Sequence, residues 1–393
     1  MSVTDAVPFR IEIAQSVLER IRKRVIDYRW FDPPQGGTDE AWAHGMSTPV
    51  LKDFVQHWRK KYDWRAVEVE LNKHPHFKAC IDGLDIHFLH IVGEAKGKRP
   101  LLVTHGWPGS FYEFWDVIEP LAFPSRFGGN ESDAFDLVIP SLPGYGFSGK
   151  PETLFGQRAT AALWDKLMRD VLGYDTYLAQ GGDWGAMVTS YIGLNHGHHN
   201  QQGGCKAIHL NMMGFRPTPA TPQTDSETAW LEKSATAMQA EGSYFMQQAT
   251  KPQTLAFALM DSPVGQAAWI LEKFHGWSDL ADGDLWSVYS KDQLITNLML
   301  YLVNDAFATS VRYYQSFFFE GGANLPEGLR CETPTGFADF PGETFLAAPP
   351  RSWAERAYNI THWSDMPRGG HFAAMEVPAL YIDEVRNWAR SFD

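Results

Sequence analysis

The chain has 393 residues, of which 44% are hydrophobic, and a formal net charge of −13 at pH 7. This length allows one large domain with an insertion or two ordinary domains, and the acidic balance excludes a basic surface for nucleic acid or anionic lipid. Three scattered cysteines exclude a disulfide framework and a zinc site, so we expect a reducing, cytoplasmic setting.

The first 95 residues begin with two amphipathic patterns. Apolar residues at 17–25 share one face of an expected helix, and those at 51–58 repeat the same spacing. Residues 77–92 then alternate as a β-hairpin that turns at Asp82-Gly83. Two helices with one apolar face each must pack against another part of the chain.

From Pro100 onward, short apolar strands alternate with helices, which is typical of a mostly parallel sheet covered on both faces. A helical block interrupts this pattern before it resumes near residue 333. Such an insertion is typical of a lid over the strand ends, where open α/β sheets place their sites. The predicted parts are an N-terminal segment (1–95), the first part of the core (96–215), a helical lid (216–325) and the second part of the core (326–393).

The stretch from Gly181 to Gly185 lies between an expected strand and an expected helix, with Asp183 at its centre. The glycines let a sharp turn expose this carboxylate and bring the next backbone N–H close to the reacting atom. The alternative is an ordinary glycine turn with an aspartate N-cap. An ionised carboxylate needs no base to attack a saturated carbon. The substrate is therefore expected to be an alkylating electrophile, such as an epoxide or an alkyl halide.

An alkyl ester on Asp183 must be cleaved by activated water. His371 follows two glycines after the last expected strand, which favours it as the base. A carboxylate should orient this histidine. We expect that carboxylate to be Glu343, after the preceding strand, in preference to Asp339 or Asp365.

Two further groups are expected around the reacting atoms. The backbone N–H groups of Trp107 and Trp184 are predicted to form the oxyanion hole. In the lid, Tyr244 and Tyr314 are candidates to donate hydrogen bonds to the alkoxide that epoxide opening produces. Halide departure needs only N–H donors, and Trp184 also suits that role. These residue types therefore leave both electrophiles open, while the complete set argues against a catalytically silent binding module.

Histidines at 196–199 and 74–76 suggest a metal site at first sight. Metal ligands normally come with carboxylates in a defined geometry, so we interpret the two groups as a solvated helix end and a turn. The sequence has no phosphate-binding loop and no dinucleotide fingerprint. No metal and no cofactor is expected.

Seven stretches carry a family resemblance over nearly the whole chain: "DWRAVEVELNKHPHFKACIDGLDIHFLH", "HGWPGSFYEFW", "PSLPGYGFS", "QGGDWGAMV", "ALMDSPVGQAAWILEKF", "PTGFADFPGE" and "RGGHFAAMEVP". Together they resemble the microsomal-type epoxide hydrolases of the α/β-hydrolase superfamily. The resemblance implies an α/β-hydrolase fold with a mostly parallel central sheet, an inserted helical lid and an N-terminal segment that wraps both. It also implies Asp183 as nucleophile, His371 as base and Glu343 as the acidic partner.

The same resemblance implies that Tyr244 and Tyr314 hold and protonate the epoxide oxygen, with the adjacent Tyr313 as the alternative register. The implied reaction converts an apolar or aromatic epoxide to a vicinal diol without a cofactor, and a homodimer is left open. Mammalian microsomal and insect juvenile-hormone members begin with a membrane anchor. No comparable apolar run is present here. We therefore expect similarity to the soluble microbial members and do not carry over detoxification or hormone roles.

Overall fold

The computed structural model describes residues 3–31, 42–95, 99–201 and 203–392. Its nine-stranded sheet has the order β1-β2-β3-β5-β4-β6-β7-β8-β9. The six strands from β5 to β9 in that order are parallel, and β1, β2 and β3 extend the sheet with antiparallel pairings. The strands are β1 (Val7–Phe9), β2 (His76–Ile81), β3 (Leu84–Ile91), β4 (Pro100–Thr104), β5 (Asp136–Pro140), β6 (Tyr177–Gly181), β7 (Cys205–Leu210), β8 (Cys331–Asp339) and β9 (Tyr358–Asp365).

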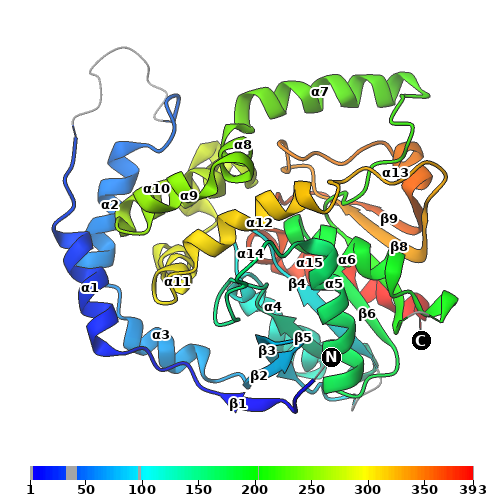
Figure 1. The fold of residues 1–393 in the computed structure, drawn as a ribbon, viewed down its shortest axis with the longest axis horizontal. Coiled ribbons are helices and arrows are strands. Elements are labelled where there is room, and N and C mark those ends of the chain that lie inside the picture. Colours follow the sequence, from blue (N-terminus) through cyan, green and yellow to red (C-terminus); the bar gives the residue numbers. More distant parts are fainter. Residues whose placement is uncertain (1–2, 32–41, 96–98, 202, 393) are drawn as a thin grey trace.

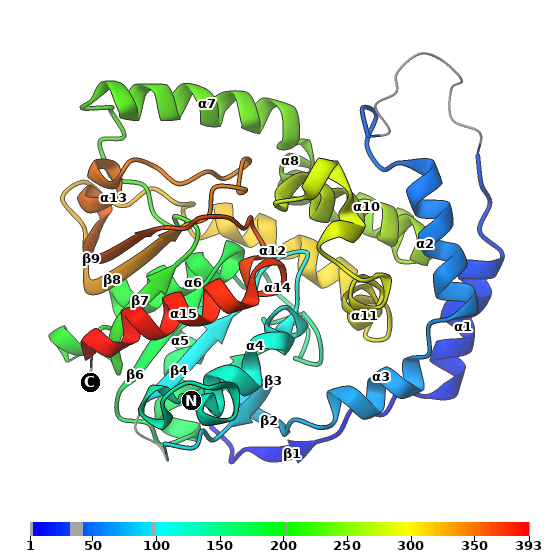
Figure 2. The ribbon, with the colours of Figure 1, turned by 180° about the vertical axis from the view of Figure 1, so that it is seen from behind.

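Helices cover both faces of this sheet, as the sequence predicted. Figure 1 shows α5 and α6 in front of the strands, and Figure 2 shows α4 and α15 on the opposite face. Every residue of β4, β5 and β6 is buried, as is typical of parallel strands covered on both faces. The core helices are α4 (Trp115–Ala122), α5 (Gln157–Lys166), α6 (Asp183–Asn195), α13 (Arg351–Ala357), α14 (Ala373–Glu376) and α15 (Pro378–Ala389).

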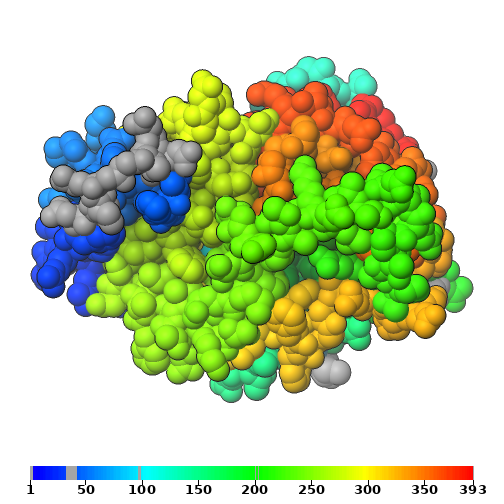
Figure 3. All heavy atoms as spheres, turned by 90° about the horizontal axis from the view of Figure 1, so that it is seen from above, coloured from blue at the N-terminus to red at the C-terminus, as the bar shows by residue number. Residues whose placement is uncertain are grey.

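Six helices lie between β7 and β8, above the carboxyl ends of the parallel strands, and α7 runs across the upper face (Figure 3). Within the described ranges, no single helix is long and apolar enough to cross a membrane; α11 and α12 pass that test only as a pair bent by 81°. These helices are α7 (Asp225–Glu241), α8 (Ser243–Thr250), α9 (Pro252–Leu259), α10 (Pro263–Trp277), α11 (Lys291–Leu302) and α12 (Phe307–Phe319).

The N-terminal segment contacts both the lid and the sheet. Its helices are α1 (Gln15–Ile26), α2 (Thr48–Lys60) and α3 (Trp64–Leu71). Helix α1 packs on α10 and α2 packs on α11, so the two predicted amphipathic faces are buried against the lid. The predicted hairpin is also confirmed, because β2 and β3 join at Asp82 and Gly83, whose φ angles are 52° and 86°.

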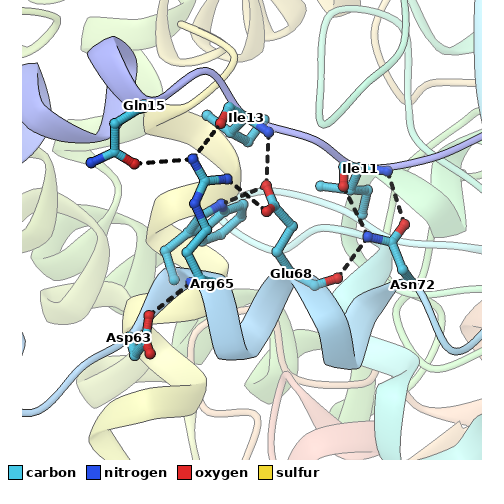
Figure 4. Close-up of polar contacts among 8 residues, drawn as sticks. Ile11, Ile13, Gln15, Asp63, Arg65, Glu68 and Asn72 are labelled. Atoms are coloured by element: carbon cyan, nitrogen blue, oxygen red, sulfur yellow. Dashed lines mark hydrogen bonds and ion pairs between the residues drawn. The ribbon is translucent and has the colours of Figure 1, made fainter.

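Hydrogen bonds fasten the first residues of the chain to α3 (Figure 4). The Glu68 carboxylate accepts hydrogen bonds from the backbone N–H of Ile13 at 2.7 Å, the Trp64 indole at 3.1 Å and the Arg65 guanidinium at 2.7 Å. The side chain of Asn72 pairs with both backbone groups of Ile11, at 2.9 and 2.8 Å. The extended stretch before α1 is therefore held along its length.

Candidate active site

Asp183 occupies the sharp turn between β6 and α6. Its φ angle of 47° lies in the left-handed region, which is uncommon for a residue with a side chain and is typical of strained functional turns. The turn also needs glycine at position 185, since a Cβ there would lie 1.9 Å from the Thr104 carbonyl oxygen. Helix α6 can therefore approach β4 closely enough to present the Asp183 side chain to the lid.

Two groups hold the oxygens of Asp183 in place. The backbone N–H of Trp107 donates to Oδ1 at 2.7 Å, and Nε2 of His371 lies 3.4 Å from Oδ2. The other ring nitrogen of His371, Nδ1, is hydrogen-bonded to Glu343. The predicted nucleophile, base and acidic partner thus form one continuous array, although they are far apart in the sequence.

The charge on His371 is set by this array. Burial disfavours the charged ring, but the carboxylates of Glu343 and Asp183 outweigh burial and hold the pKa of His371 well above its usual range. With both partners ionised, the imidazole is therefore protonated near neutral pH. A protonated imidazole must lose a proton before it can accept one from water.

Glu343, and neither alternative aspartate, contacts His371. Its second oxygen accepts the backbone N–H groups of Phe345 at 3.1 Å and Leu346 at 2.9 Å, which fixes the carboxylate. Asp339 and Asp365 instead line a separate surface hollow beside α13. Glu343 therefore remains the proposed acidic partner.

The loop that carries His371 is clamped by a residue that the sequence analysis missed. Glu376 accepts hydrogen bonds from the backbone N–H groups on both sides of His371, those of Gly370 at 2.9 Å and Phe372 at 2.7 Å. It also accepts from the N–H of Asp279 at 2.7 Å. Burial raises the pKa of Glu376 to about 7 against these hydrogen bonds.

The two expected oxyanion groups belong to residues that contact or adjoin Asp183. The N–H of Trp107 already points at the carboxylate, and Trp184 lies in the first turn of α6, where backbone N–H groups lack intrahelical partners. Lid helix α11 fixes the loop that carries Trp107. Asn297 donates to the Pro108 carbonyl at 2.8 Å and accepts from Ser110 Oγ at 2.8 Å.

Both expected lid tyrosines line the same cavity as Asp183. The rings of Tyr244 and Tyr314 are 5.9 Å apart, and Tyr314 Oη has no hydrogen-bond partner among the described residues. Burial and the Asp183 charge raise the pKa of both phenols well above the usual range, so both are protonated donors. Tyr313 is not an equivalent choice, because its hydroxyl is bonded to Thr160 at 2.8 Å.

The cavity has a volume of about 400 Å³ and a predominantly apolar wall. Such a wall suits an apolar or aromatic ligand whose orientation is set by a few polar groups. The apolar lining includes Met187, Met212, Met213, Phe245, Phe317 and Phe345.

A second buried carboxyl group near the array was also missed. Burial raises the pKa of Glu113 to about 8, and its charged neighbours include His371 and Asp183. The residue belongs to the same "HGWPGSFYEF" stretch as Trp107. The sequence signal that could have identified Glu113 is an acidic residue among aromatic neighbours.

The expected turn at residues 74–76 does not extend to His76, which is the first residue of β2. This side chain is buried, and its Nδ1 lies 2.8 Å from Nε2 of the buried His87 while its Nε2 lies 2.8 Å from the Leu71 carbonyl oxygen. The hairpin pairing of β2 with β3 places the two histidines together. Across the described parts of the chain, no group of three or more His, Cys, Asp or Glu residues could hold a metal ion.

Comparisons with known proteins agree with this architecture. The family model of the epoxide hydrolase N terminus matches residues 6–114, and that of the alpha/beta hydrolase fold matches residues 99–255. A protein of Stigmatella aurantiaca is 42% identical over 98% of this chain and 84% of its own length. Epoxide hydrolase 1 of Sus scrofa is 35% identical over 97% and 88%. The crystal structure of juvenile hormone epoxide hydrolase from the silkworm Bombyx mori has a TM-score of 0.85 and 31% identity, covering 99% of this chain and 94% of that one.

Proposed function

Because the chain belongs to the epoxide hydrolase family, we propose that it converts epoxides to vicinal diols through a covalent ester on Asp183. The observation that carries this proposal is the shared cavity. One wall presents the carboxylate of Asp183, and the opposing lid presents the phenols of Tyr244 and Tyr314. A strained three-membered ether placed between them meets a nucleophile and two acids at once.

In the first step, an oxygen of Asp183 attacks one epoxide carbon and the carbon–oxygen bond of the ring breaks. The electron pair of that bond stays on the epoxide oxygen, which takes a proton from Tyr244 or Tyr314. Protonated phenols are suited to this transfer because they are hydrogen-bond donors until the alkoxide develops. The products of the step are a hydroxyalkyl ester and a phenolate.

The second step follows from the loss of charge on Asp183. An ester is neutral, so only Glu343 then holds the pKa of His371 up, and the imidazolium can give its proton, through solvent, to the phenolate. Neutral His371 next accepts a proton from water, whose oxygen attacks the ester carbonyl. The N–H groups of Trp107 and Trp184 bind the resulting oxyanion. Its collapse breaks the ester carbon–oxygen bond, the leaving alkoxide takes the second proton of the attacking water to give the diol, and the Asp183 carboxylate and the His371 imidazolium are restored. Formation of the ester therefore allows His371 to act as the base in hydrolysis of that ester.

Isotope labelling tests the ester directly. In a single turnover in oxygen-18 water, the diol should carry one oxygen-16 from the protein, and Asp183 should gain the label. In His371→Gln, the ester should accumulate as a mass adduct equal to one styrene oxide, while Asp183→Asn should form none. Solvent oxygen in the first-turnover diol would refute covalent catalysis.

One observation favours a second candidate reaction, the hydrolysis of alkyl halides. The indole N–H groups of Trp107 and Trp184 are buried, and neither has a hydrogen-bond partner among the described residues. Indole N–H donors can bind a departing halide. A free-halide assay with 1-bromobutane separates the reactions: diol without halide supports the epoxide assignment, and halide without diol reverses it.

The proposed substrate is an apolar or aromatic epoxide, which fits the methionine and phenylalanine wall of the cavity. We infer a cytoplasmic setting from the free thiols of Cys80, Cys205 and Cys331. Light scattering during size-exclusion chromatography would distinguish a homodimer from a monomer. Comparing styrene oxide with a short polar epoxide would test the substrate class, since the apolar wall should favour the former.

A further inference from the structure

A buried lysine of the lid lies against one of the proposed acids. Lys273, on α10, is only 5% exposed. Its Nζ lies 4.7 Å from the centre of the Tyr244 ring and 5.8 Å from that of the Trp277 ring. A lysine is rarely buried to this extent unless its charge is compensated. Here the Glu272 carboxylate is 2.6 Å from Nζ.

The ring beneath this ammonium is surrounded by negative charge. Asp183, Glu343 and Glu272 all oppose ionisation of Tyr244, in addition to the larger effect of burial. These effects keep the phenol protonated in the free enzyme. They also penalise the negative charge that must develop on its oxygen when the proton moves to an alkoxide. A nearby cation would reduce that penalty.

We propose that Lys273 is a positioning residue for epoxide opening, because its ammonium over the Tyr244 ring stabilises the charge that develops there as the phenol gives up its proton. A cation is attracted to an aromatic face, more strongly when water is excluded, and the attraction grows as the ring becomes anionic. The inference rests on the proposed function, in which Tyr244 protonates the epoxide oxygen.

The test is the rate of ester formation on Asp183 with styrene oxide, followed by rapid quench and intact-protein mass. Lys273→Met keeps the apolar stem and removes the charge, so it should slow ester formation about tenfold and leave ester hydrolysis within about twofold. Lys273→Arg keeps the charge and should recover the rate to within about threefold. Lys291→Met is the matched control, because Lys291 also holds an ammonium over a lid tryptophan, Trp286, at 5.2 Å.

A double-mutant cycle separates this role from simple packing. In a Tyr244→Phe background, Lys273→Met should cost at most about twofold, because the hydroxyl through which it acts is gone. A tenfold loss in both backgrounds would reveal a packing role and overturn the inference, as would no loss in either. If Tyr244→Phe alone left ester formation unchanged, Tyr314 would be the proton donor, and the inference would fall while the proposed function stood.

Glu272 provides a second variant that does not disturb the buried lysine stem. Its side chain is 25% exposed, but it compensates the buried ammonium, so circular dichroism must first establish that Glu272→Gln is folded. Removal of this opposing charge should make ester formation about twofold faster. An unchanged or slower rate in Glu272→Gln would contradict the proposal even if Lys273→Met failed to fold.

Discussion

At the scale of single residues, the central fact is that one imidazole lies between two carboxylates. Nε2 of His371 faces Asp183 at 3.4 Å while Nδ1 is bonded to Glu343. Each carboxylate favours the protonated ring. The pKa of His371 is therefore high in the free protein, and we expect ester formation on Asp183 to lower it.

The pKa of His371 should fall when either carboxylate is neutralised. Asp183→Asn imitates the charge of the ester, and we expect it to lower this pKa, because an opposite charge 3.4 Å from Nε2 has been removed. Titration of the histidine ring signals by NMR measures the shift. Asp339→Asn, which removes a carboxylate that lines a different hollow, should leave the value unchanged; equal shifts in both variants would contradict the assignment.

The raised pKa of Glu113 predicts how stability changes with pH. The folded carboxyl keeps its proton up to about pH 8, whereas the unfolded one releases it near its ordinary value of 4.5. The folded state thus binds more protons between these values, so its free energy of unfolding falls as pH rises through that window. Relative to Glu113→Gln, the wild-type Tm should drop by about 3 °C or more between pH 5.5 and 8. Parallel Tm profiles for the two proteins would disprove this.

At the scale of elements, α11 joins the lid to the catalytic loop. Asn297 bonds to Pro108 and Ser110, and Tyr301 donates to the Gly109 carbonyl at 2.6 Å. These contacts are all buried and flank the residue whose N–H holds Asp183. The lid therefore fixes the loop that carries the Trp107 N–H, one of the two donors proposed for the oxyanion hole.

Loss of this connection should reduce catalysis more than it reduces folding. We expect Asn297→Ala to lower kcat about tenfold, because a displaced Trp107 N–H stabilises the oxyanion less well. Steady-state kinetics with styrene oxide and circular dichroism would measure the two effects. Asn304 lies just beyond α11, and its side chain donates a hydrogen bond to the Leu300 carbonyl. Asn304→Ala removes only that bond, so it serves as the control and should retain nearly full activity.

The elements that the sequence predicted well are those with local signals. The apolar face at 51–58 and the Asp82-Gly83 turn are set by neighbouring residues. Helix α3 was missed because Glu68 interrupts its apolar pattern and becomes buried through contacts with a distant segment. In the candidate site, Asp183 has a recognisable turn, whereas Lys273 acquires its position only from tertiary packing. The chemistry of a turn can be read locally, but the partners of a buried charge cannot.

At the scale of the whole molecule, the N-terminal segment connects the lid to the sheet. Its helices α1 and α2 pack on α10 and α11, while its strands continue the sheet of the core. The lid is therefore held both by its insertion between β7 and β8 and by this outer segment. Motions that admit substrate must occur within that frame.

The hydrogen bonds to Glu68 should determine how firmly the N-terminal segment is held together. Glu68→Ala leaves the Ile13 N–H, the Trp64 indole and Arg65 without their shared acceptor, so we expect a loss of about 3 kcal/mol in the free energy of unfolding. Urea unfolding and limited proteolysis near residues 9–15 would measure it. Glu70→Ala, on the same helix but in an exposed ion pair with Lys73, should cost less than about 1 kcal/mol. Equal losses would contradict a special role for Glu68.

The antiparallel pairing of β3 with β5 has a consequence for dissecting the protein. Ile91 to Phe88 of β3 cover the backbone of Leu137 to Pro140, which would otherwise be the outer border of the parallel strands. In a shortened chain that began after β3, β5 would be an edge strand of the sheet. The backbone groups of residues 137–140, whose side chains are all apolar, would then be unpaired. Such a fragment would recruit a strand from another copy and aggregate, so the hydrolase core is not a separable module.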